Sequence, residues 1–389
     1  MTRITVRWTW FMLAASVALS AAHGGTPVAT ILSAAEQVRA RGLLTEGDWN
    51  HGVPACTDCY APNLLGVAPT IPPLAGQSAR AMRKLLRSFR DGIRPPSAVA
   101  GAIMWHVSRG LSAPDLELIS AYIAGIAPGT GLTAQRPAHE SGYLFEPQAP
   151  DHFRPPPESA IPLGPQGDTI WRGRLIFVNT QRYSKPYVGA ALNCSSCHLD
   201  RGRAGSAPMW AAYVSYPKYR SENRKVNTLI ERIQDCFRFS MNGKPPAADS
   251  DTMVALVTYF RWLATGLPVG IEPKGAGYPP LPAPLKPYSI KRGAVIYAQD
   301  CAMCHAANGA GRKSGDTQVF PPLWGPRSFN RGAGMARIST AAAFIGTNMP
   351  YGAAGLLSNQ QAWDVAAFVD SQARPQTPRF TGKVETPRR

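Results

Sequence analysis

The sequence predicts an all-α protein built from three tandem units of similar plan. C-x-x-C pairs occur three times, at Cys56/Cys59, Cys194/Cys197 and Cys301/Cys304. A glycine-bearing segment precedes each pair, and a segment with helical apolar periodicity follows it, over residues 116–126, 253–263 and 362–368. Proline-rich stretches, which cannot continue a helix, separate the units. We therefore expect units at residues 23–130, 167–271 and 288–376, packed closely across linkers at 131–166 and 272–287.

The first 22 residues have the composition of a secretory signal peptide. Arg3 and Arg7 precede an apolar run over residues 8–19, and small residues follow over 20–22. This run is shorter than the ~20 apolar residues that a transmembrane helix needs. We therefore expect export, a periplasmic location and no membrane span after signal removal, with a basic tail at residues 377–389.

The chain has 389 residues and a formal net charge of +17. A nucleic-acid partner is one explanation of such a charge, but an exported protein rarely meets one. An anionic substrate or an acidic redox partner fits the expected compartment better, because a positive field raises the local concentration of anions.

The second and third pairs continue into histidine, as Cys194-Ser-Ser-Cys197-His198 and Cys301-Ala-Met-Cys304-His305. This motif is the attachment signature of c-type haem, in which two thiols bind the porphyrin and the adjacent imidazole is the proximal iron ligand. A zinc site would combine two pairs in one tetrahedron, and a thioredoxin-like motif would end a strand of a βαβ unit that we do not find. The motifs therefore predict two haem c groups.

The helices that follow the pairs carry start signals. Ser112 and Ser358 precede the first and third of them as expected N-caps, with Asp115 and Gln361 three positions on. An N-terminal helix, a C-x-x-C-H loop and a C-terminal helix packed across the first resemble the cytochrome c fold. We therefore expect three cytochrome c-like units, the first of which lacks the proximal histidine.

The second axial ligand decides between electron transfer and chemistry at a haem iron. In the C-terminal unit, Met349 follows His305 by 44 residues in a loop that Pro350 would hold extended. A thioether ligand there would raise the reduction potential and suit an electron-transfer haem. Met335 is a weaker alternative, and Met349 is the predicted ligand.

The central unit offers an unpaired cysteine instead. Cys236 follows His198 by 38 residues, near the position that a distal ligand would occupy. Arg232, four residues earlier, would lie on the same helical face and favour the thiolate form of Cys236. A buried inert thiol is the plainer interpretation, and the alternative ligands are Met209, Met241 and Met253.

The stretch from about residue 155 to 375 resembles the dihaem thiosulfate dehydrogenases. The resemblance rests on GPQGDTI (164–170), IFVNTQ (176–181), NCSSCHLD (193–200), SAPMW (206–210), VNTLIERIQDCF (226–237) and SMNGK (240–244). It implies that thiosulfate is oxidised to tetrathionate, with Cys236 as distal ligand and carrier of the sulfur intermediate. It also implies that a haem at His305 relays electrons to an external acceptor, such as a small cytochrome c or a terminal oxidase.

Two thiosulfate dianions must meet at such a site, so arginines are needed to offset their repulsion. Arg232 is the first candidate, followed by Arg203, Arg220 and Arg224. Some members of the family have a lysine beside the methionine of the second haem as an alternative ligand. Asn348 occupies that position here, so we expect no ligand switch by that lysine.

The N-terminal unit, over residues 42–127, resembles small periplasmic monohaem and dihaem cytochromes, with Met104 at their distal position. Tyr60 replaces the histidine after Cys56 and Cys59. Attachment machinery that requires the histidine should pass over this pair, so a haem-free unit with a Cys56–Cys59 disulfide is favoured over a third haem. His51 and His106 could in principle ligate a haem placed there by another route. Such a degenerate unit could serve as a docking surface for an electron acceptor.

Two alternatives to thiosulfate oxidation remain. Tetrathionate reduction is the same chemistry in reverse, and its direction depends on potentials that the sequence does not fix. A pure electron-transfer cytochrome is the second alternative, but it has no use for a cysteine beside an arginine and would be expected to ligate through Met241.

Overall fold

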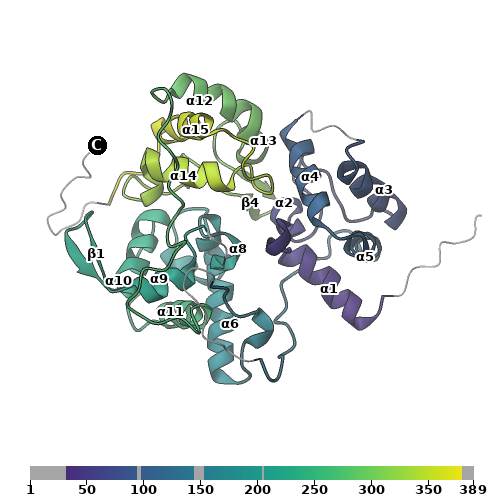
Figure 1. The fold of residues 1–389 in the computed structure, drawn as a ribbon, viewed down its shortest axis with the longest axis horizontal. Coiled ribbons are helices and arrows are strands. Elements are labelled where there is room, and N and C mark those ends of the chain that lie inside the picture. Colours follow the sequence, from purple (N-terminus) through teal and green to yellow (C-terminus); the bar gives the residue numbers. More distant parts are fainter. Residues whose placement is uncertain (1–31, 94–97, 144–152, 204–205, 379–389) are drawn as a thin grey trace, which may run out of the picture. The chain divides into compact units, whose positions relative to one another are not determined.

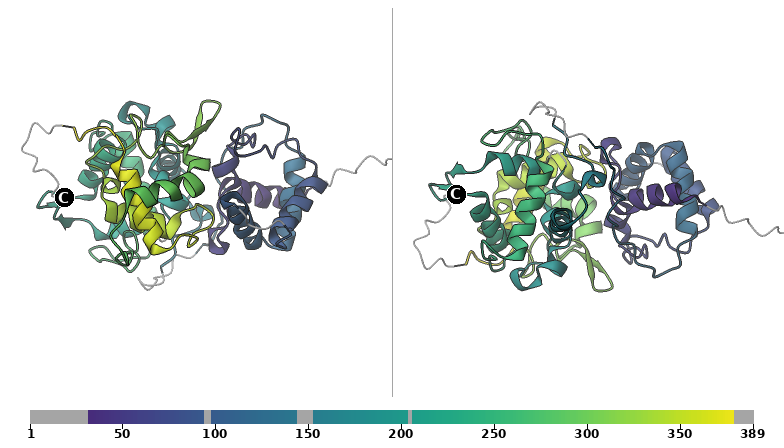
Figure 2. Two further views of the ribbon diagram at one scale, coloured as in Figure 1. Left: turned by 90° about the horizontal axis from the view of Figure 1, so that it is seen from above. Right: turned by 90° about the horizontal axis from the view of Figure 1, so that it is seen from below.

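A computed structural model describes residues 32–93, 98–143, 153–203 and 206–378 of the 389-residue chain. The predicted signal peptide and most of the basic tail lie outside these residues. Helices make up most of the regular structure in every view (Figures 1 and 2). Among the described helices, none is long and apolar enough to cross a membrane.

The N-terminal region, defined here as residues 32–130, has helices and no multi-residue strand among its described residues. Its elements are α1 (Ala34–Thr45), α2 (Cys56–Tyr60), α3 (Ala79–Arg90), α4 (Val99–Gly110) and α5 (Ala113–Ala124). Ser112 caps α5 by accepting a hydrogen bond from the Asp115 amide, as predicted. Helix α1 packs against α5.

The central region, residues 153–271, contains six helices and a hairpin. They are α6 (Pro165–Val178), α7 (Thr180–Tyr183), α8 (Leu199–Gly202), α9 (Met209–Ser215), α10 (Leu229–Asp235), α11 (Asp251–Leu263), β1 (Lys218–Arg220) and β2 (Lys225–Asn227). The two strands are antiparallel, with Tyr219 opposite Val226. Helices α6 and α11 pack together over the largest buried cluster, which includes Phe177, Trp210 and Tyr259.

The C-terminal region, residues 288–378, repeats the arrangement of a first helix packed on a last one. It comprises α12 (Ile290–Ile296), α13 (Ala302–His305), α14 (Ile338–Asn348), α15 (Asn359–Ser371), β3 (Arg312–Ser314) and β4 (Thr317–Phe320). Helix α12 packs on α15, and Ser358 caps α15 as predicted. Strands β3 and β4 are antiparallel with a bulge at Arg312/Lys313. The two hairpins correct the all-α prediction to a mostly helical fold.

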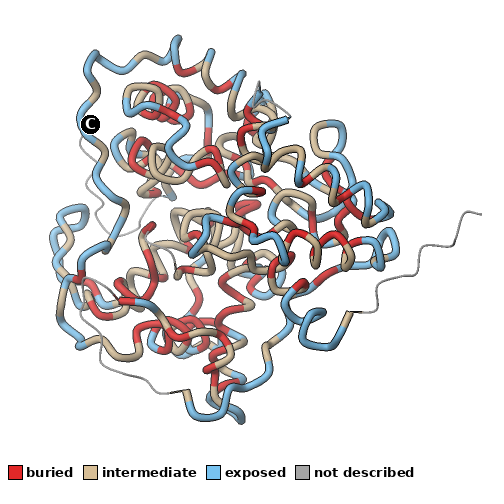
Figure 3. The backbone as a smooth tube through the Cα atoms, turned by 45° about the vertical axis from the view of Figure 1, so that its right-hand side comes forward, coloured by how far each residue is buried: buried red, intermediate tan, exposed pale blue. Residues whose placement is uncertain are grey.

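Glycines allow two of these helix pairs to cross closely. A Cβ atom on Gly173 of α6 would clash with the Ala255 carbonyl of α11, and one on Gly293 of α12 would clash with the Asp364 carbonyl of α15. Buried and exposed stretches alternate along the helices, as amphipathic packing requires (Figure 3). The glycines in the segments before the second and third C-x-x-C pairs therefore serve helix packing.

Gly173→Ala is expected to destabilise the protein by about 1–3 kcal/mol, because the added methyl group meets backbone that must shift. Gly42→Ala in α1 is the matched control, since a Cβ there meets no atom within 4 Å. This control should be neutral or stabilising by up to about 1 kcal/mol through helix propensity. Denaturant unfolding of the three proteins compares them, and equal stabilities would contradict the packing role.

Candidate active site

A cavity of about 1370 Å³ reaches all three C-x-x-C pairs. Its walls are mostly apolar side chains, among them Leu86 and Ile119 in the N-terminal region and Phe344 and Ile345 in the C-terminal region. Cys197 and Cys304 line it together with His305. A large apolar cavity with thiols at its wall fits covalently attached haem.

His198 and His305 are held in the orientation that proximal haem ligands need. The Nδ1 atom of His198 lies 2.7 Å from the Ala207 carbonyl oxygen, and that of His305 lies 2.9 Å from the Pro321 carbonyl oxygen. This contact fixes the ring and leaves Nε2 free for a metal. Burial lowers the pKa of His198 to about 4 and also lowers the pKa of His305. Both imidazoles are therefore kept neutral, as iron ligation requires.

Cys236 and Arg232 lie one helical turn apart at the end of α10. A capping box of Thr228 and Glu231 begins this helix. The Cys236 amide donates to the Arg232 carbonyl, and a π-helical turn over Cys236–Ser240 follows, closed by the bond from the Met241 amide to the Cys236 carbonyl (2.9 Å). Turns of this kind are frequent at functional sites.

Electrostatic effects show that Cys236, Arg232 and the haem motif lie together. The pKa of Arg232 is raised, chiefly by the charge of Cys236. Burial raises the pKa of Cys194 and of Cys197 to about 12, and Cys236 contributes to both shifts. Arg232 in turn helps to lower the pKa of His198. Cys236 and Arg232 thus lie within electrostatic reach of the second C-x-x-C-H motif, although neither is among the residues that line the cavity.

The alternative methionines of the central region are core residues. Met209, Met241 and Met253 have exposed fractions of 7%, 4% and 0% and belong to the main buried cluster. Cys236 does not belong to this cluster in the described chain. The three methionines are therefore packed in the core, whereas Cys236 lies outside that packing.

Tyr278 is a site residue that the sequence interpretation missed, because it lies in the segment 272–287 expected to be a linker. Its hydroxyl donates to the Cys197 carbonyl at 3.0 Å, and its ring packs edge-on against Phe344 of α14, with centroids 5.5 Å apart. The charges of Cys197, Cys236 and Arg232 all influence its pKa, which is raised mainly by burial. The linker therefore forms part of the site.

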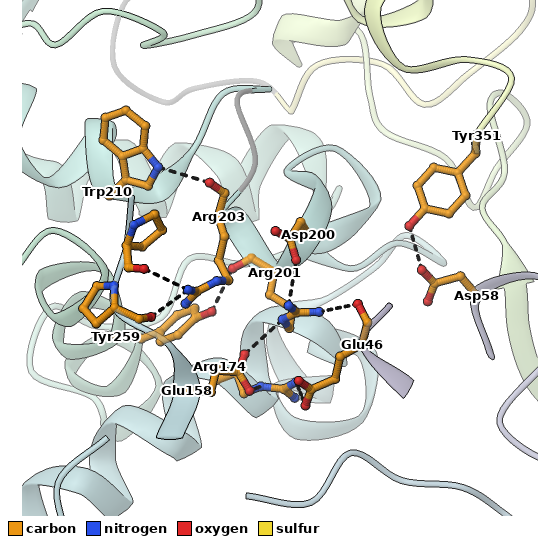
Figure 4. A network of polar contacts seen from close by, with 12 residues as sticks. Glu46, Asp58, Glu158, Arg174, Asp200, Arg201, Arg203, Trp210, Tyr259 and Tyr351 are labelled. Carbon is orange, nitrogen blue, oxygen red and sulfur yellow. Dashed lines mark hydrogen bonds and ion pairs between the residues drawn. The ribbon is translucent and has the colours of Figure 1, made fainter. Parts of the chain in front are cut away.

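The predicted substrate arginines are not equivalent. Arg203 donates to the Pro155 and Pro156 carbonyls at 3.0 and 2.6 Å, which commits its side chain to a buried polar network (Figure 4). Arg220 pairs with Glu222 at 3.2 Å on the hairpin, and Glu222 is close enough to influence the pKa of Arg232. Arg224 lies in the turn of the same hairpin. Of these four arginines, Arg232 is the one whose pKa is raised chiefly by the charge of Cys236.

The same network joins the N-terminal region to the central region. Arg174, with 1% of its surface exposed, contacts Glu46 at 3.0 Å and Glu158 at 2.8 Å. Arg201 adds contacts to Glu158 at 3.0 Å and to Asp200 at 2.8 Å (Figure 4). Burial alone would raise the pKa of Glu158, but the arginines hold it at about 2. A second contact, between the Tyr351 hydroxyl and Asp58 at 2.6 Å, links the N-terminal and C-terminal regions.

Met349 lines the cavity that also contains His305, directly after α14 and in the extended conformation that was predicted. Met335 lines the cavity as well. Asn348, the last residue of α14, donates to the Ser206 hydroxyl at 2.8 Å. Motif analysis did not find this contact, because the two residues lie 142 positions apart in the sequence.

The first C-x-x-C pair has a different environment. The Tyr60 hydroxyl donates directly to the Met104 sulfur at 3.3 Å, and both residues line the cavity with Cys56 and Cys59. Metal bonds of about 2 Å on each side would need donor atoms about 4 Å apart. These residues therefore do not fit an iron between them.

Three further expectations for this pair can be compared with the structure. No disulfide joins Cys56 to Cys59 in the structure, in contrast to the expected pairing. Burial raises the pKa of Cys56 to about 12, so it is neutral. His51 is exposed and pairs with Asp48 at 3.0 Å, and His106 is also exposed, so neither is placed to replace the missing histidine.

Two family profiles match the chain. The SoxA/TsdA cytochrome c domain matches residues 180–269, and the cytochrome c family matches residues 290–373. The protein therefore contains two cytochrome c domains, which correspond to the central and C-terminal regions. Such domains with C-x-x-C-H motifs imply haem c.

Similar proteins share these domains. A thiosulfate dehydrogenase from Thiomonas intermedia (strain K12) is 55% identical over 237 residues, or 61% of this chain and 76% of the relative. A thiosulfate dehydrogenase electron acceptor from Stutzerimonas stutzeri (strain A1501) is 36% identical over 93 residues, or 24% of this chain and 42% of that protein. The solved thiosulfate dehydrogenase (TsdBA) from Marichromatium purpuratum, in its as-isolated form, is 41% identical with a TM-score of 0.77. The match covers 90% of this chain and 72% of that chain.

Proposed function

The chain belongs to the thiosulfate dehydrogenase family, and from this premise we propose that it oxidises thiosulfate to tetrathionate at Cys236. The observation that carries the proposal is the placement of Cys236 and Arg232 beside the haem motif of the central domain. His198 would hold the haem at this site, with Cys236 as its distal ligand. His305 and Met349 would hold the haem of the C-terminal domain.

The chemistry balances in two steps. The sulfane sulfur of one thiosulfate bonds to the Cys236 thiolate. Formation of this S–S bond releases two electrons and leaves a sulfonate-capped disulfide on Cys236. The sulfane sulfur of a second thiosulfate then attacks this adduct, which forms tetrathionate and returns the Cys236 thiolate. Bound haem supplies one-electron acceptors for the first step.

Arg232 would offset the negative charge of the adduct and of the second thiosulfate. The adduct keeps one negative charge, and the attacking thiosulfate brings two more. Arg232 is half-buried near Cys236 and cannot be deprotonated at physiological pH, so it would supply a fixed positive charge where these anions meet. Arg232 lies one helical turn before Cys236, so the two side chains share one face of the helix.

Arg232→Gln is expected to lower kcat/KM for thiosulfate roughly 10²-fold, because it removes that charge without shortening the side chain greatly. Arg220→Gln is the matched comparison. Arg220 already pairs with Glu222, so we expect a much smaller loss. Steady-state kinetics with an artificial electron acceptor would decide, and equal losses in the two variants would contradict the special role of Arg232.

The direction of the reaction follows from one experiment. Purified holoprotein is mixed with thiosulfate, and haem reduction is followed by absorbance; reduced protein is mixed with tetrathionate in parallel. Faster reduction by thiosulfate than oxidation by tetrathionate supports the proposal. The opposite ranking would identify a tetrathionate reductase. Lack of response to either compound would leave a pure electron-transfer protein.

The N-terminal region is proposed to be a third cytochrome c-like unit that carries no iron. Tyr60 is followed by Ala61 with φ 63° and ψ 161°, and His305 by Ala306 with φ 60° and ψ 156°. The amide six residues on donates to the carbonyl of Tyr60 at 2.9 Å and of His305 at 3.0 Å. The backbone after Tyr60 thus has the same local conformation as the backbone after His305. The match to the solved thiosulfate dehydrogenase covers 90% of this chain, so it must include part of the N-terminal region. We therefore propose two haems per chain.

This region would provide the docking surface for an external acceptor, such as a small cytochrome c or a terminal oxidase. The similarity of 93 residues of the chain to an electron acceptor of thiosulfate dehydrogenase supports a role in electron exit. The basic composition would favour an acidic acceptor. The proposed location is the periplasm, on the strength of the N-terminal signal sequence.

A further inference from the structure

The hydrogen bond between Asn348 and Ser206 joins two places that matter for the proposed haem ligands. Asn348 ends α14 and immediately precedes Met349. Ser206 immediately precedes Ala207, whose carbonyl oxygen lies 2.7 Å from Nδ1 of His198. A short path therefore runs from the methionine of the C-terminal domain to the proximal histidine of the central domain.

Each part of this path is fixed by further contacts. The Asn348 amide nitrogen also lies 2.9 Å from the Phe344 carbonyl and 2.9 Å from the Thr347 hydroxyl. Ser206 has only 5% of its surface exposed. The Ala207 amide donates to the Gly277 carbonyl at 2.8 Å, and Ala207 has a φ of 52°, a left-handed conformation that costs energy for a residue with a side chain. The surrounding structure thus holds the Ala207 carbonyl in one place.

We propose that Asn348 is a positioning residue that holds the Met349 thioether toward the iron, and that its bond to Ser206 couples the axial ligands of the two haem sites. This inference rests on the proposed function, because it assumes haem at both motifs and Met349 as a ligand. The Met349 amide already donates to the Ile345 carbonyl at 3.0 Å. Ser206 adds a restraint on the preceding residue from the central domain.

The proposed coupling predicts the sign of the change in haem reduction potential when the Asn348–Ser206 bond is removed. A methionine ligand raises the reduction potential of a haem, so loosening Met349 lowers the potential of the C-terminal site. Moving Ser206 also shifts the peptide that orients His198, which tunes the central site. Electron transfer between the sites then slows, which lowers kcat and leaves KM for thiosulfate nearly unchanged.

The test uses the holoprotein and three variants: Ser206→Ala, Asn348→Ala and the double variant. Ser206→Ala is the sharper single change, because Asn348 keeps its contacts to its own helix. Spectroelectrochemical titration gives the two haem potentials, and the red absorption band of methionine-ligated ferric haem reports the Met349 bond. Ser215→Ala is the matched control, since its hydroxyl only donates to Ala211 within α9.

We expect both single variants to lower the potential of the C-terminal haem, by a shift equivalent to about threefold to tenfold in the redox equilibrium. Tenfold corresponds to about 59 mV for one electron. The double variant should shift it no further than the larger single change, because both remove one bond. The control should match the wild type.

Two results would overturn the inference alone. The first is that the wild type shows the methionine band and that Ser206→Ala changes neither this band nor the two haem potentials. Asn348 would then only stabilise the end of its own helix. The other is additive shifts in the double variant. Absence of the methionine band in the wild type would instead remove Met349 as the proposed ligand, and this inference with it.

Discussion

Cys236→Ala is expected to abolish thiosulfate oxidation, with at least about a 10³-fold loss of kcat, while both haems stay attached. The haem attachment residues are Cys194, Cys197, Cys301 and Cys304, and none of them is altered. The variant loses the sulfur on which the first thiosulfate is bound, so neither step of the proposed reaction can proceed. Its haem spectrum should also change at one site, because the distal position of the central haem loses its ligand.

Stopped-flow reduction by thiosulfate, together with haem content per chain, measures both effects. Met241→Leu is the matched control, because Met241 is the alternative distal ligand and is 4% exposed in the core. This variant should keep its turnover and spectrum. If Cys236→Ala retained turnover while Met241→Leu changed the central haem spectrum, the catalytic role of Cys236 would be wrong and the electron-transfer interpretation would replace it.

Tyr60→His is expected to raise the haem content from two to three per chain. The substitution completes a C-x-x-C-H motif at Cys56, Cys59 and residue 60, in a backbone that already matches the one around His305. The substitution also removes the phenol whose hydroxyl donates a hydrogen bond to the Met104 sulfur. An imidazole is shorter than a phenol, so it leaves room for a metal between residue 60 and Met104. Met104 then becomes available as a distal ligand.

Intact-protein mass and haem staining of the denatured chain count the covalent haems. Tyr60→Phe is the control: it breaks the bond to Met104 without adding a histidine, and should stay at two haems. A wild-type protein with three haems would show that the tyrosine does not block attachment. A histidine variant that folds but stays at two would show that the cavity is closed for another reason.

The sequence predicts the parts of this protein that depend on local spacing. The two C-x-x-C-H motifs, the caps at Ser112 and Ser358, and the pairing of Cys236 with Arg232 four residues earlier are all set within short stretches. The structure confirms the two caps. Local rules suffice here because one helical turn fixes which side chains meet.

The features that the sequence did not predict depend on contacts between distant segments. Tyr278 was assigned to a linker because proline-rich composition says nothing of what a segment packs against. Arg203 was a substrate candidate by charge alone, and its partners at Pro155 and Pro156 lie 47 to 48 positions away. The disulfide expected at Cys56 and Cys59 followed from the missing histidine after this pair, whereas the structure shows no bond between the two cysteines, which line the cavity.

The buried ions around Arg174 decide whether the N-terminal region is a detachable module. Arg174 is 1% exposed, and one of its two carboxylate partners, Glu46, belongs to that region. A chain beginning after residue 130 would retain three arginines at this point but lose one of the carboxylates that neutralise them. Removing one partner of a buried pair typically costs about 3–5 kcal/mol. The shortened chain is therefore expected to be less stable, and the N-terminal region contributes to the scaffold that holds the central domain.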